Sequence, residues 1–319
     1  METINILCAT DNNYAPYCGI MLTSLFESNK DCHFVVYVFE DGSVTKTNAE
    51  KYQRLSKKYG NEILFRTIEG GLVDTFPVRK EANISIPTYY RLLAANLLPE
   101  SVHKVVYLDC DTLVVDDIKP LWEVDTTNVA IAGVRDHYLS RGKDRRPNTP
   151  YDYINAGVLV MNLDYWRRNG VYSRIFDYIQ MNRDDETKLF YLDQDALNAV
   201  LNENKNVLPE RFNFQVEMFV KEFWHSFSED QQNVFIEEGK HVSVIHYLGV
   251  KPWKGHKYFG PCFYEWEKMR RKSLWPFCRL HAPWHKQIKL VIKRLFFKNL
   301  IRKQVQEIWF SPTELQLFL

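Results

Sequence analysis

Strand-like apolar runs alternate with helix-like segments through the first third of the chain, and this alternation limits the fold more than any other feature. The strand-like runs are residues 4–10, 33–39, 62–68 and 102–108. The helix-like segments between them are residues 16–28, 47–60 and 86–98. Strands joined through helices run parallel, because each crossover returns the chain to the same end of the sheet. The pattern predicts an α/β fold with a mostly parallel, doubly wound sheet, which binds ligands beyond the carboxyl ends of its strands.

Local signals bound these helices and indicate later elements. Pro16 suits the first turn of a helix. Thr47 and Glu50 have the spacing of a capping box, and Gly60 favours a helix end at that residue. Further strands are predicted at residues 129–134, 154–163 and 241–248. The polar, proline-containing segment 136–153 is predicted to be a loop or lid.

The composition is that of an ordinary globular protein. A chain of 319 residues, 45% apolar and 25% charged, is long enough for one large domain with an appendage. No apolar run approaches the about 18 residues of a membrane span, and METINILCATDNN lacks the layout of a signal peptide. The six cysteines include no Cys-x-x-Cys pair. We therefore expect reduced thiols in a cytoplasmic protein rather than zinc or a disulfide framework.

Basic residues are concentrated near the end of the chain. Residues 268–306 contain twelve Lys or Arg and no acidic residue, which leaves 29 basic against 40 acidic residues elsewhere. We expect a catalytic body at residues 1–265 and a basic, mainly helical tail at residues 266–319. An apolar stripe in 285–304 leaves two interpretations: a helix packed on the body, or an interfacial helix on the anionic inner face of the cell membrane. No nucleic-acid-binding motif accompanies the charge, so no nucleic acid partner is predicted.

Two acidic residues, Asp109 and Asp111, follow the strand at 102–108 with Cys110 between them. Two carboxylates this close repel each other and lose hydration. One interpretation is a turn in which the Asp side chains accept backbone hydrogen bonds. The other is a hard divalent cation, Mg²⁺ or Mn²⁺, which offsets the repulsion and completes its shell with substrate phosphates.

Two further segments contain candidate ligand-binding residues. In VIHYLGVKPWKG, His246 is either a ligand of Mn²⁺ or a hydrogen-bonded structural residue. Gly249 allows a close backbone approach, and Lys251 has the charge to pair with a phosphate. The segment ATDNNYAPY forms either a helix-capping turn or a nucleotide site. It lacks the glycines of a dinucleotide or Walker motif, which argues against a dehydrogenase, a P-loop NTPase and a sugar nucleotidyltransferase.

Short polar residues of the kind that bind sugar hydroxyls occur in NAGVLVMN and LDQDALN. They are Asn155, Asp193 and Gln194. Asp193 and Asp195 also suit a helix start, where the macrodipole favours acids. Arg91, on the helix-like segment beside the expected sheet edge, either pairs with an acid or contributes to the same site.

Seven motifs, in this order along the chain, resemble those of the retaining family 8 glycosyltransferases. They are ATDNNY, ISIPTYYRL, VVYLDCDTLV, INAGVLVMNL, DQDALN, RFNF and HYLGVKPWK. The similarity extends over about residues 4–255. It is greatest to bacterial lipopolysaccharide and lipooligosaccharide galactosyl- and glucosyltransferases. The resemblance implies a GT-A fold, a UDP-sugar donor, Mn²⁺ or Mg²⁺, an α-linked product and a glycan or glycolipid acceptor.

The resemblance also implies a role for each matching residue. The metal ligands would be Asp109, Asp111 and His246, with Cys110 also at the donor site. The uridine-binding loop would contain Ala9, Thr10, Asp11, Asn13 and Tyr14. The diphosphate would lie at Gly249 and Lys251, and the donor sugar at Arg91, Asn155, Asp193 and Gln194. The segment from His246 to Trp253 is one residue shorter than the family's H-x-x-G-x-x-K-P-W, so Lys251 would reach the phosphate from a shifted backbone.

The expected reaction transfers galactose or glucose with retention, in bacterial cell-surface polysaccharide synthesis. Galactose is favoured by the resemblance, and Asp193 and Arg91 are expected to distinguish the two sugars. Retention requires a covalent intermediate or acceptor attack on the leaving group's face. The candidate catalytic residues are Gln194, Asp193 and Asp195; because no carboxylate is an obvious nucleophile, front-face attack is favoured. Two other classes stay open: a non-catalytic UDP-sugar or glycan-binding protein, and a metal-dependent phosphoesterase.

Overall fold

Two hydrophobic clusters on opposite faces of the central sheet explain the continuous apolar runs in the sequence. In β1 (Thr3–Thr10), Ile4 and Ile6 pack into one cluster with α1 (Ala15–Ser28), whereas Leu7 packs into the other. Both faces are therefore covered, as expected for a doubly wound sheet. The computed structural model describes residues 3–69, 71, 75–78, 86–137, 152–219, 227–249, 251–254 and 262–278.

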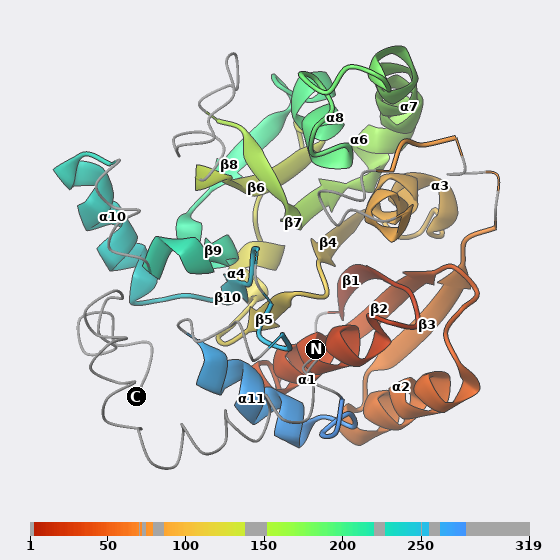
Figure 1. The fold of residues 1–319 in the computed structure, drawn as a ribbon, viewed down its shortest axis with the longest axis vertical. Coiled ribbons are helices and arrows are strands. Elements are labelled where there is room, and N and C mark those ends of the chain that lie inside the picture. Colours follow the sequence, from red (N-terminus) through yellow and green to blue (C-terminus); the bar gives the residue numbers. More distant parts are fainter. Residues whose placement is uncertain are drawn as a thin grey trace.

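Seven strands of the described residues form the central sheet, in the order β3-β2-β1-β4-β7-β6-β8 (Figure 1). Besides β1 they are β2 (His33–Glu40), β3 (Glu62–Thr67), β4 (Lys104–Leu108), β6 (Ile131–Arg135), β7 (Ile154–Asn162) and β8 (Lys205–Leu208). The pairs β2–β3, β1–β2, β1–β4 and β6–β8 are parallel. Only β7 is antiparallel to its neighbours, β4 and β6, so the sheet is mostly parallel.

A second, three-stranded sheet has the order β5-β10-β9. Its strands are β5 (Thr112–Val114), β10 (Val244–His246) and β9 (Phe214–Gln215). The β5–β10 pair is antiparallel, with His246 opposite Thr112. This register brings a segment from late in the chain against the acidic pair that follows β4.

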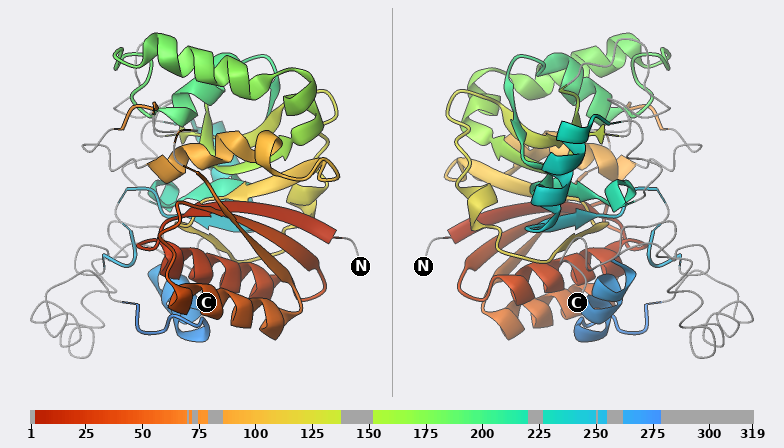
Figure 2. Two further views of the ribbon diagram at one scale, coloured as in Figure 1. Left: turned by 90° about the vertical axis from the view of Figure 1, so that its right-hand side faces the viewer. Right: turned by 90° about the vertical axis from the view of Figure 1, so that its left-hand side faces the viewer.

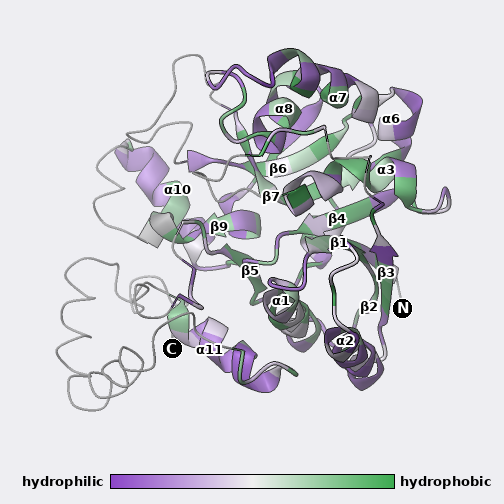
Figure 3. Ribbon diagram, turned by 45° about the vertical axis from the view of Figure 1, so that its right-hand side comes forward, coloured by the Kyte–Doolittle hydropathy of each residue, from purple (hydrophilic) through white to green (hydrophobic). Residues whose placement is uncertain are grey.

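Helices cover both faces of the central sheet (Figure 2). On one face lie α1, α2 (Lys46–Tyr59) and α11 (Phe263–Lys272). On the other lie η1 (Ile86–Leu93), α3 (Ala94–Leu97), α6 (Leu163–Arg168), α7 (Val171–Asn182) and α8 (Asp193–Val200). The remaining helices of the described residues are α4 (Lys119–Trp122), η2 (Glu210–Asn213), η3 (Val216–Phe219) and α10 (Glu229–Gly239). Figure 3 shows that α2 is largely hydrophilic, and its buried residues are Tyr52 and Leu55 alone.

The predicted helices are present, with local differences. The capping box expected at Thr47 is wrong, because α2 begins after Thr45, whose side chain accepts a hydrogen bond from the Asn48 N–H. Gly60 ends α2 with a φ of 67°, as predicted. The helix expected at 86–98 is the 3₁₀ helix η1 followed by the single turn α3.

The strand predicted at 241–248 is shorter than expected. It is reduced to the three residues of β10, because its partners β5 and β9 contain only three and two residues. Most of the loop or lid predicted at 136–153 lies outside the described residues, as does the whole helix predicted at 285–304.

The C-terminal end of the described chain packs on the body. The domain boundary expected at residue 265 falls inside α11, and beyond it Trp266 and Trp275 are 2% and 3% exposed. We therefore propose that the packed body extends at least to residue 278. None of the helices that the structure describes combines the length and apolar character needed to cross a membrane.

Candidate active site

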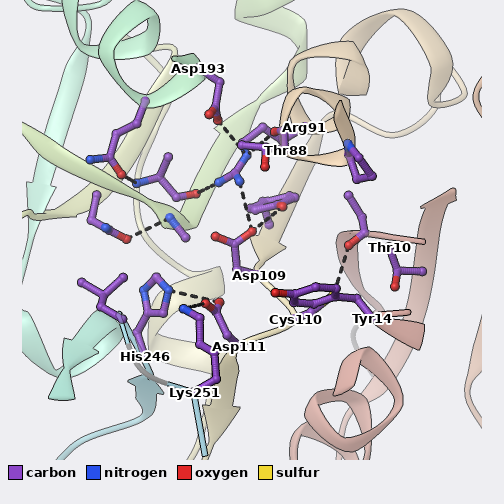
Figure 4. A pocket seen from close by; sticks show the side chains of 18 of the residues that line it. Thr10, Tyr14, Thr88, Arg91, Asp109, Cys110, Asp111, Asp193, His246 and Lys251 are labelled. Carbon is purple, nitrogen blue, oxygen red and sulfur yellow. Dashed lines mark hydrogen bonds and ion pairs between the residues drawn. The ribbon is translucent and has the colours of Figure 1, made fainter. Parts of the chain in front are cut away.

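A cleft of about 660 Å³ opens beyond the carboxyl ends of β1 and β4, where a doubly wound sheet is expected to bind its ligand. Figure 4 shows side chains from both sheets, η1 and α8 around it. The predicted residues that line the cleft are Ala9, Thr10, Asp11, Asn13, Tyr14, Arg91, Asp109, Cys110, Asp111, Asn155, Asp193, Gln194, His246, Gly249 and Lys251. Asp195 is not among the lining residues.

Asp109, Asp111, His246 and Lys251 form a charged group that we call the metal corner. His246 Nε2 lies 3.2 Å from Asp111 Oδ1, and Lys251 Nζ forms an ion pair with Asp111 Oδ2. One ligand atom from each of Asp109, Asp111 and His246 lies within 4.8 Å of the other two. Within the described ranges, this is the one such group of His, Cys, Asp or Glu side chains. The pairing of β5 with β10 brings it together.

The two carboxylates of the metal corner differ in their electrostatic environment. Burial raises the pKa of Asp109 and the nearby Asp111 raises it further, although the Arg91 guanidinium lowers it. Burial would also raise the pKa of Asp111, but Lys251 and His246 together hold that pKa well below its usual range. Asp111 is therefore the more fully compensated anion.

A chain of amides orients the imidazole of His246. Its Nδ1 lies 2.9 Å from Asn213 Oδ1, and Asn213 Nδ2 donates to Asn155 Oδ1 over 3.0 Å. Because the amide oxygen of Asn213 can only accept, Nδ1 carries a hydrogen, and Nε2 is the atom that faces Asp111. Histidines that bind metals are oriented by such a partner on their other ring nitrogen.

Gly157 makes room for this arrangement, although the sequence analysis did not identify it. A Cβ added there would lie 2.1 Å from His246 Cε1 and 3.0 Å from Asp109 Oδ2. Its N–H also donates to Asn155 Oδ1 over 2.9 Å. The available signal was a glycine inside a predicted strand, which often marks a close approach by another group.

Arg91, Asn155, Asp193 and Gln194 form a second group, which we call the sugar wall. Arg91 is 4% exposed; its Nη2 donates to Asp109 Oδ1 over 3.1 Å and its Nη1 donates to the Ala156 carbonyl. Burial lowers the pKa of Arg91, but the carboxylates of Asp109 and Asp193 outweigh it and raise that pKa above its usual value. Arg91 is therefore a permanent cation that links the sugar wall to the metal corner.

Tyr107 and Lys254 also line the cleft, and neither was predicted from the sequence as a site residue. The Tyr107 hydroxyl donates to Asp109 Oδ1 over 2.6 Å, and the Arg91 guanidinium lies 4.4 Å from the Tyr107 ring centroid. Alternation along a strand was the available signal for Tyr107, because residues two apart point to the same side.

Asp193 carries a buried oxygen that accepts no hydrogen bond. Its Oδ2 lies 3.1 Å from Arg91 Nε, but that N–H donates to the Thr88 carbonyl over 3.0 Å. Burial raises the pKa of Asp193 to about 7, against the lowering effect of Arg91. The preceding Leu192 has a φ of 48°, a strained value for a residue other than glycine. This oxygen is ion-paired with Arg91 but accepts no hydrogen bond, so it is suited to receive one from a ligand hydroxyl.

The amide of Gln194 is already hydrogen-bonded within the protein. Its Oε1 accepts from the Ala156 N–H over 2.9 Å, and its Nε2 donates to Asp136 Oδ2 over 3.1 Å. Asn155 donates to the same Asp136 oxygen over 3.0 Å. Asp136 thus fixes the orientation of two amides of the sugar wall.

Asp195, a predicted catalytic residue, lies behind the sugar wall. Its two carboxylate oxygens accept from the Tyr153 hydroxyl over 2.6 Å and from the Tyr191 N–H over 2.7 Å. These bonds hold the turn that leads into α8, so we interpret Asp195 as a residue that positions Asp193 and Gln194.

Residues 11–14 form the base loop, between β1 and α1. Asp11 Oδ1 accepts from the Tyr14 N–H over 2.8 Å, so the turn expected at this position is present. Tyr14 is 39% exposed, and its ring lies edge-on to Trp253 at 6.0 Å. Burial is the main cause that raises the pKa of Tyr14 to about 12, so the phenol is neutral. The turn is therefore present and lines the cleft, but the expected Asn or Asp cap is not: the N-cap of α1 is Tyr14, without a side-chain cap bond.

Comparisons with known proteins identify the family. The family model described as "Glycosyl transferase family 8" matches residues 5–257. The structure of the galactosyltransferase LgtC in complex with donor and acceptor sugar analogs is similar, with a TM-score of 0.73 and 26% identity. That similarity covers 85% of this chain and 96% of LgtC.

Curated relatives include proteins from several bacteria. General stress protein A of Bacillus subtilis is 27% identical, over 80% of this chain and 89% of its own length. The lipopolysaccharide 1,3-galactosyltransferase of Salmonella typhimurium is 24% identical, over 92% and 86% respectively. A lipopolysaccharide 1,2-glucosyltransferase of Escherichia coli is 28% identical, over 79% and 74%.

The predicted resemblance and the predicted fold class are both confirmed. The family model matches well over half of the chain, and the mostly parallel sheet has the architecture of the LgtC structure. The chain therefore belongs to glycosyl transferase family 8 and has a GT-A fold.

Proposed function

We propose that this glycosyltransferase is a metal-dependent, retaining enzyme that transfers a hexose from a UDP-sugar to a glycan or glycolipid, in the synthesis of a bacterial cell-surface polysaccharide. The observation that carries the proposal is the ligand cluster of Asp109, Asp111 and His246 in one cleft with the base loop and the sugar wall. The named activities of the lipopolysaccharide glycosyltransferases among its relatives support it.

The donor set of the metal corner fits a hard divalent cation. Two carboxylates and one imidazole converge there, and Asn213 holds the imidazole with Nε2 toward Asp111. Asp109, Asp111 and His246 would hold Mn²⁺ or Mg²⁺, which supplies positive charge for a diphosphate in the cleft. None of the three ligands is a soft thiolate, so the site does not select a soft metal ion.

Lys251 supports the departure of the diphosphate. When the bond between hexose and diphosphate breaks, negative charge grows on the phosphate oxygen that leaves. The ammonium of Lys251 lines the same cleft and is half of an ion pair with Asp111. Lys254 lines the cleft as well. Cations aimed at the oxygen where charge develops stabilise the transition state more than the ground state.

The sugar wall supports front-face attack by the acceptor. The Asp193 carboxylate is paired with the Arg91 guanidinium, and Gln194 Oε1 is occupied by the Ala156 N–H. Neither group is therefore a free nucleophile for a covalent intermediate. We propose that the acceptor hydroxyl attacks on the leaving group's face, and that the departing phosphate takes its proton.

The choice of hexose depends on few atoms. Galactose and glucose differ in the orientation of one hydroxyl, and a site that pairs with that hydroxyl discriminates between them. Asp193 Oδ2 is buried and ion-paired with Arg91 but accepts no hydrogen bond, so we propose it as the atom that receives a sugar hydroxyl. The similarity to the galactosyltransferase LgtC favours galactose.

Hydrolysis and transfer of a panel of UDP-hexoses, with and without Mn²⁺, test this function. We expect metal-dependent release of UDP, faster with one hexose than with the others. UDP binding without turnover of any UDP-hexose would identify a non-catalytic binding protein. Hydrolysis of simple phosphate esters would identify a metal-dependent phosphoesterase. Either result would overturn the proposed function.

We propose further, from the charge of the sequence, that the basic tail docks the enzyme on the inner face of the cell membrane. Anionic lipid attracts clustered Lys and Arg, and an apolar stripe enters the headgroup boundary. Because Trp266 and Trp275 are buried in the body, the informative truncation is after residue 278. It should abolish sedimentation with anionic liposomes and spare turnover of a soluble acceptor. Loss of folding or of all turnover would instead identify the tail as a packed part of the body.

A further inference from the structure

Two amides connect the base loop to Trp275, a residue far beyond it in the sequence. Trp275 Nε1 donates to Asn48 Oδ1 over 2.8 Å, and Asn48 Nδ2 donates to Asn12 Oδ1 over 2.9 Å. Asn12 Oδ1 also accepts the Thr45 N–H over 3.0 Å, and the Asn12 N–H donates to Ser43 Oγ over 2.9 Å. The base loop is thus held from behind by neutral hydrogen bonds.

The donors at the two ends fix the orientation of both amides. An indole N–H can only donate, and so can the backbone N–H of Thr45. Asn48 therefore presents its oxygen to Trp275 and its NH₂ group to Asn12, whose oxygen accepts two hydrogens. Without the indole N–H, the Asn48 amide is held on one side only, by its bond to Asn12, so its position is less fixed and that bond to the base loop weakens.

Packing fixes the position of the indole. Trp275 is 3% exposed, and a Cβ added at Gly19 of α1 would lie 2.1 Å from its ring. The Tyr52 ring lies edge-on at 5.0 Å, and Lys51 Nζ lies 5.6 Å from the ring centroid. The Tyr52 hydroxyl donates to the carbonyl of Ala15, the residue that follows the base loop. The same cluster therefore supports both the indole and the start of α1.

We propose that Trp275 is a positioning residue for the base loop, acting through Asn48 and Asn12. The inference rests on the proposed function, in which the base loop binds the nucleoside of the donor. A loop that is already ordered loses less freedom when its ligand binds, so this brace strengthens donor binding. It does not contact the metal corner, so it leaves the chemical step unchanged. The segment that leads into the basic tail is, in this way, part of the nucleotide site.

Three variants test the proposal. Trp275→Phe keeps an apolar ring but removes the N–H, and Asn48→Ala keeps the indole but removes the link to Asn12. Lys272→Ala is the matched control, because it breaks the 2.6 Å ion pair of the same segment with Glu27 on α1 and leads to no residue of the base loop. The measurements are the Kd of UDP with MnCl₂ by calorimetry, and KM and kcat for the preferred UDP-hexose.

Trp275→Phe and Asn48→Ala should each raise the Kd of UDP and the KM by roughly 3- to 10-fold, the worth of one net hydrogen bond, with kcat unchanged within about 2-fold. The double variant should bind UDP no more weakly than the single variant with the higher Kd, because both substitutions break the same chain of hydrogen bonds. Lys272→Ala should bind UDP as the wild type does.

The outcomes separate this inference from the proposed function. A wild-type protein that binds no UDP overturns the proposed function and the inference with it. Wild-type UDP binding that is unchanged in Trp275→Phe and Asn48→Ala overturns the inference alone. A fall in kcat at constant KM, or an equal loss of affinity in Lys272→Ala, also overturns it. Asn48→Ala controls for a folding defect in Trp275→Phe, because it leaves the buried indole ring in place.

Discussion

The metal corner and the sugar wall lie in one cleft, yet their side chains are held in opposite ways. In the metal corner, the side chains of Asp109 and Asp111 are 26% and 15% exposed, and both residues line the cleft. In the sugar wall, those of Arg91 and Asp193 are 4% and 3% exposed. Gln194, beside them, has its amide bonded within the protein. The corner is therefore suited to bind a ligand by charge, whereas the wall is suited to bind one by its fixed shape and by one oxygen that accepts no hydrogen bond.

Asp111→Ala should break the metal corner with the largest effect. It removes one proposed metal ligand and leaves Lys251 and His246 without their shared carboxylate. We expect kcat/KM for the UDP-hexose to fall by about 10³-fold or more, the scale of losing a preorganised electrostatic element. The melting temperature without metal should also fall, because the lost ion pairs with Lys251 and His246, which hold the pKa of Asp111 low, outweigh the relieved repulsion from Asp109. Activity close to that of the wild type would remove Asp111 from the metal site.

Gly157→Ala should disturb the same corner without removing a ligand. The new Cβ would lie 2.1 Å from His246 Cε1, so the imidazole must move. We expect about 10²-fold lower activity and roughly 1–3 kcal/mol lower stability, with more Mn²⁺ needed for half-maximal turnover. Gly133→Ala in β6 is the control, because its Cβ would lie 3.0 and 3.2 Å from the side-chain ends of Leu159 and Ile154 and at an ordinary 3.5 Å from the Val158 carbonyl. An unchanged Mn²⁺ requirement in Gly157→Ala would contradict the prediction.

Asp193→Asn should expose the different electrostatics of the sugar wall. Burial raises the pKa of Asp193 from 3.8 to about 7 in the folded protein, so its contribution to stability is present below about pH 3.8 and is lost as pH rises through 7. Asn stays neutral at every pH. The stability of the variant relative to the wild type should therefore increase between about pH 5 and 8, by roughly 1–3 kcal/mol. Urea unfolding without nucleotide or metal measures this, and a difference that is constant with pH would contradict it.

The same variant should have its smallest effect on donor choice. If Asp193 Oδ2 receives a sugar hydroxyl, an amide in its place weakens that bond without removing the side chain. The preference between UDP-galactose and UDP-glucose, measured in competition, should fall by roughly 3- to 10-fold. A preference equal to that of the wild type would show that other groups on the wall read the sugar.

The sequence predicted those site residues whose position follows from the end of a strand. Asp11 and Asp109 come directly after β1 and β4, and parallel neighbours place such residues at one edge. The seven motifs predicted the family and the cleft residues from α8 and the segment after β10. These are local patterns, in which residue type and spacing carry the information.

Features that depend on contacts between distant segments were not predictable in this way. The direction of β7 is one, because an apolar run has the same pattern in a parallel and an antiparallel strand. Gly157 and Asn213 are others, since each acts on His246 only after β7, η2 and β10 have come together. The position of Asp195 is a further example, because its carboxylate is held by the Tyr153 hydroxyl and the residue does not line the cleft.

The pairing of β5 with β10 has a consequence for how the protein is made. Lys251 is 140 residues after Asp111 in the sequence, whereas β1, β2 and β3 pair with near neighbours in the chain. Chains emerge from the ribosome in order, and early segments fold first. A nascent chain therefore forms its first sheet strands long before the proposed ion site is complete. If the proposed function is correct, newly made protein can act on a sugar nucleotide only when synthesis of its body is nearly finished.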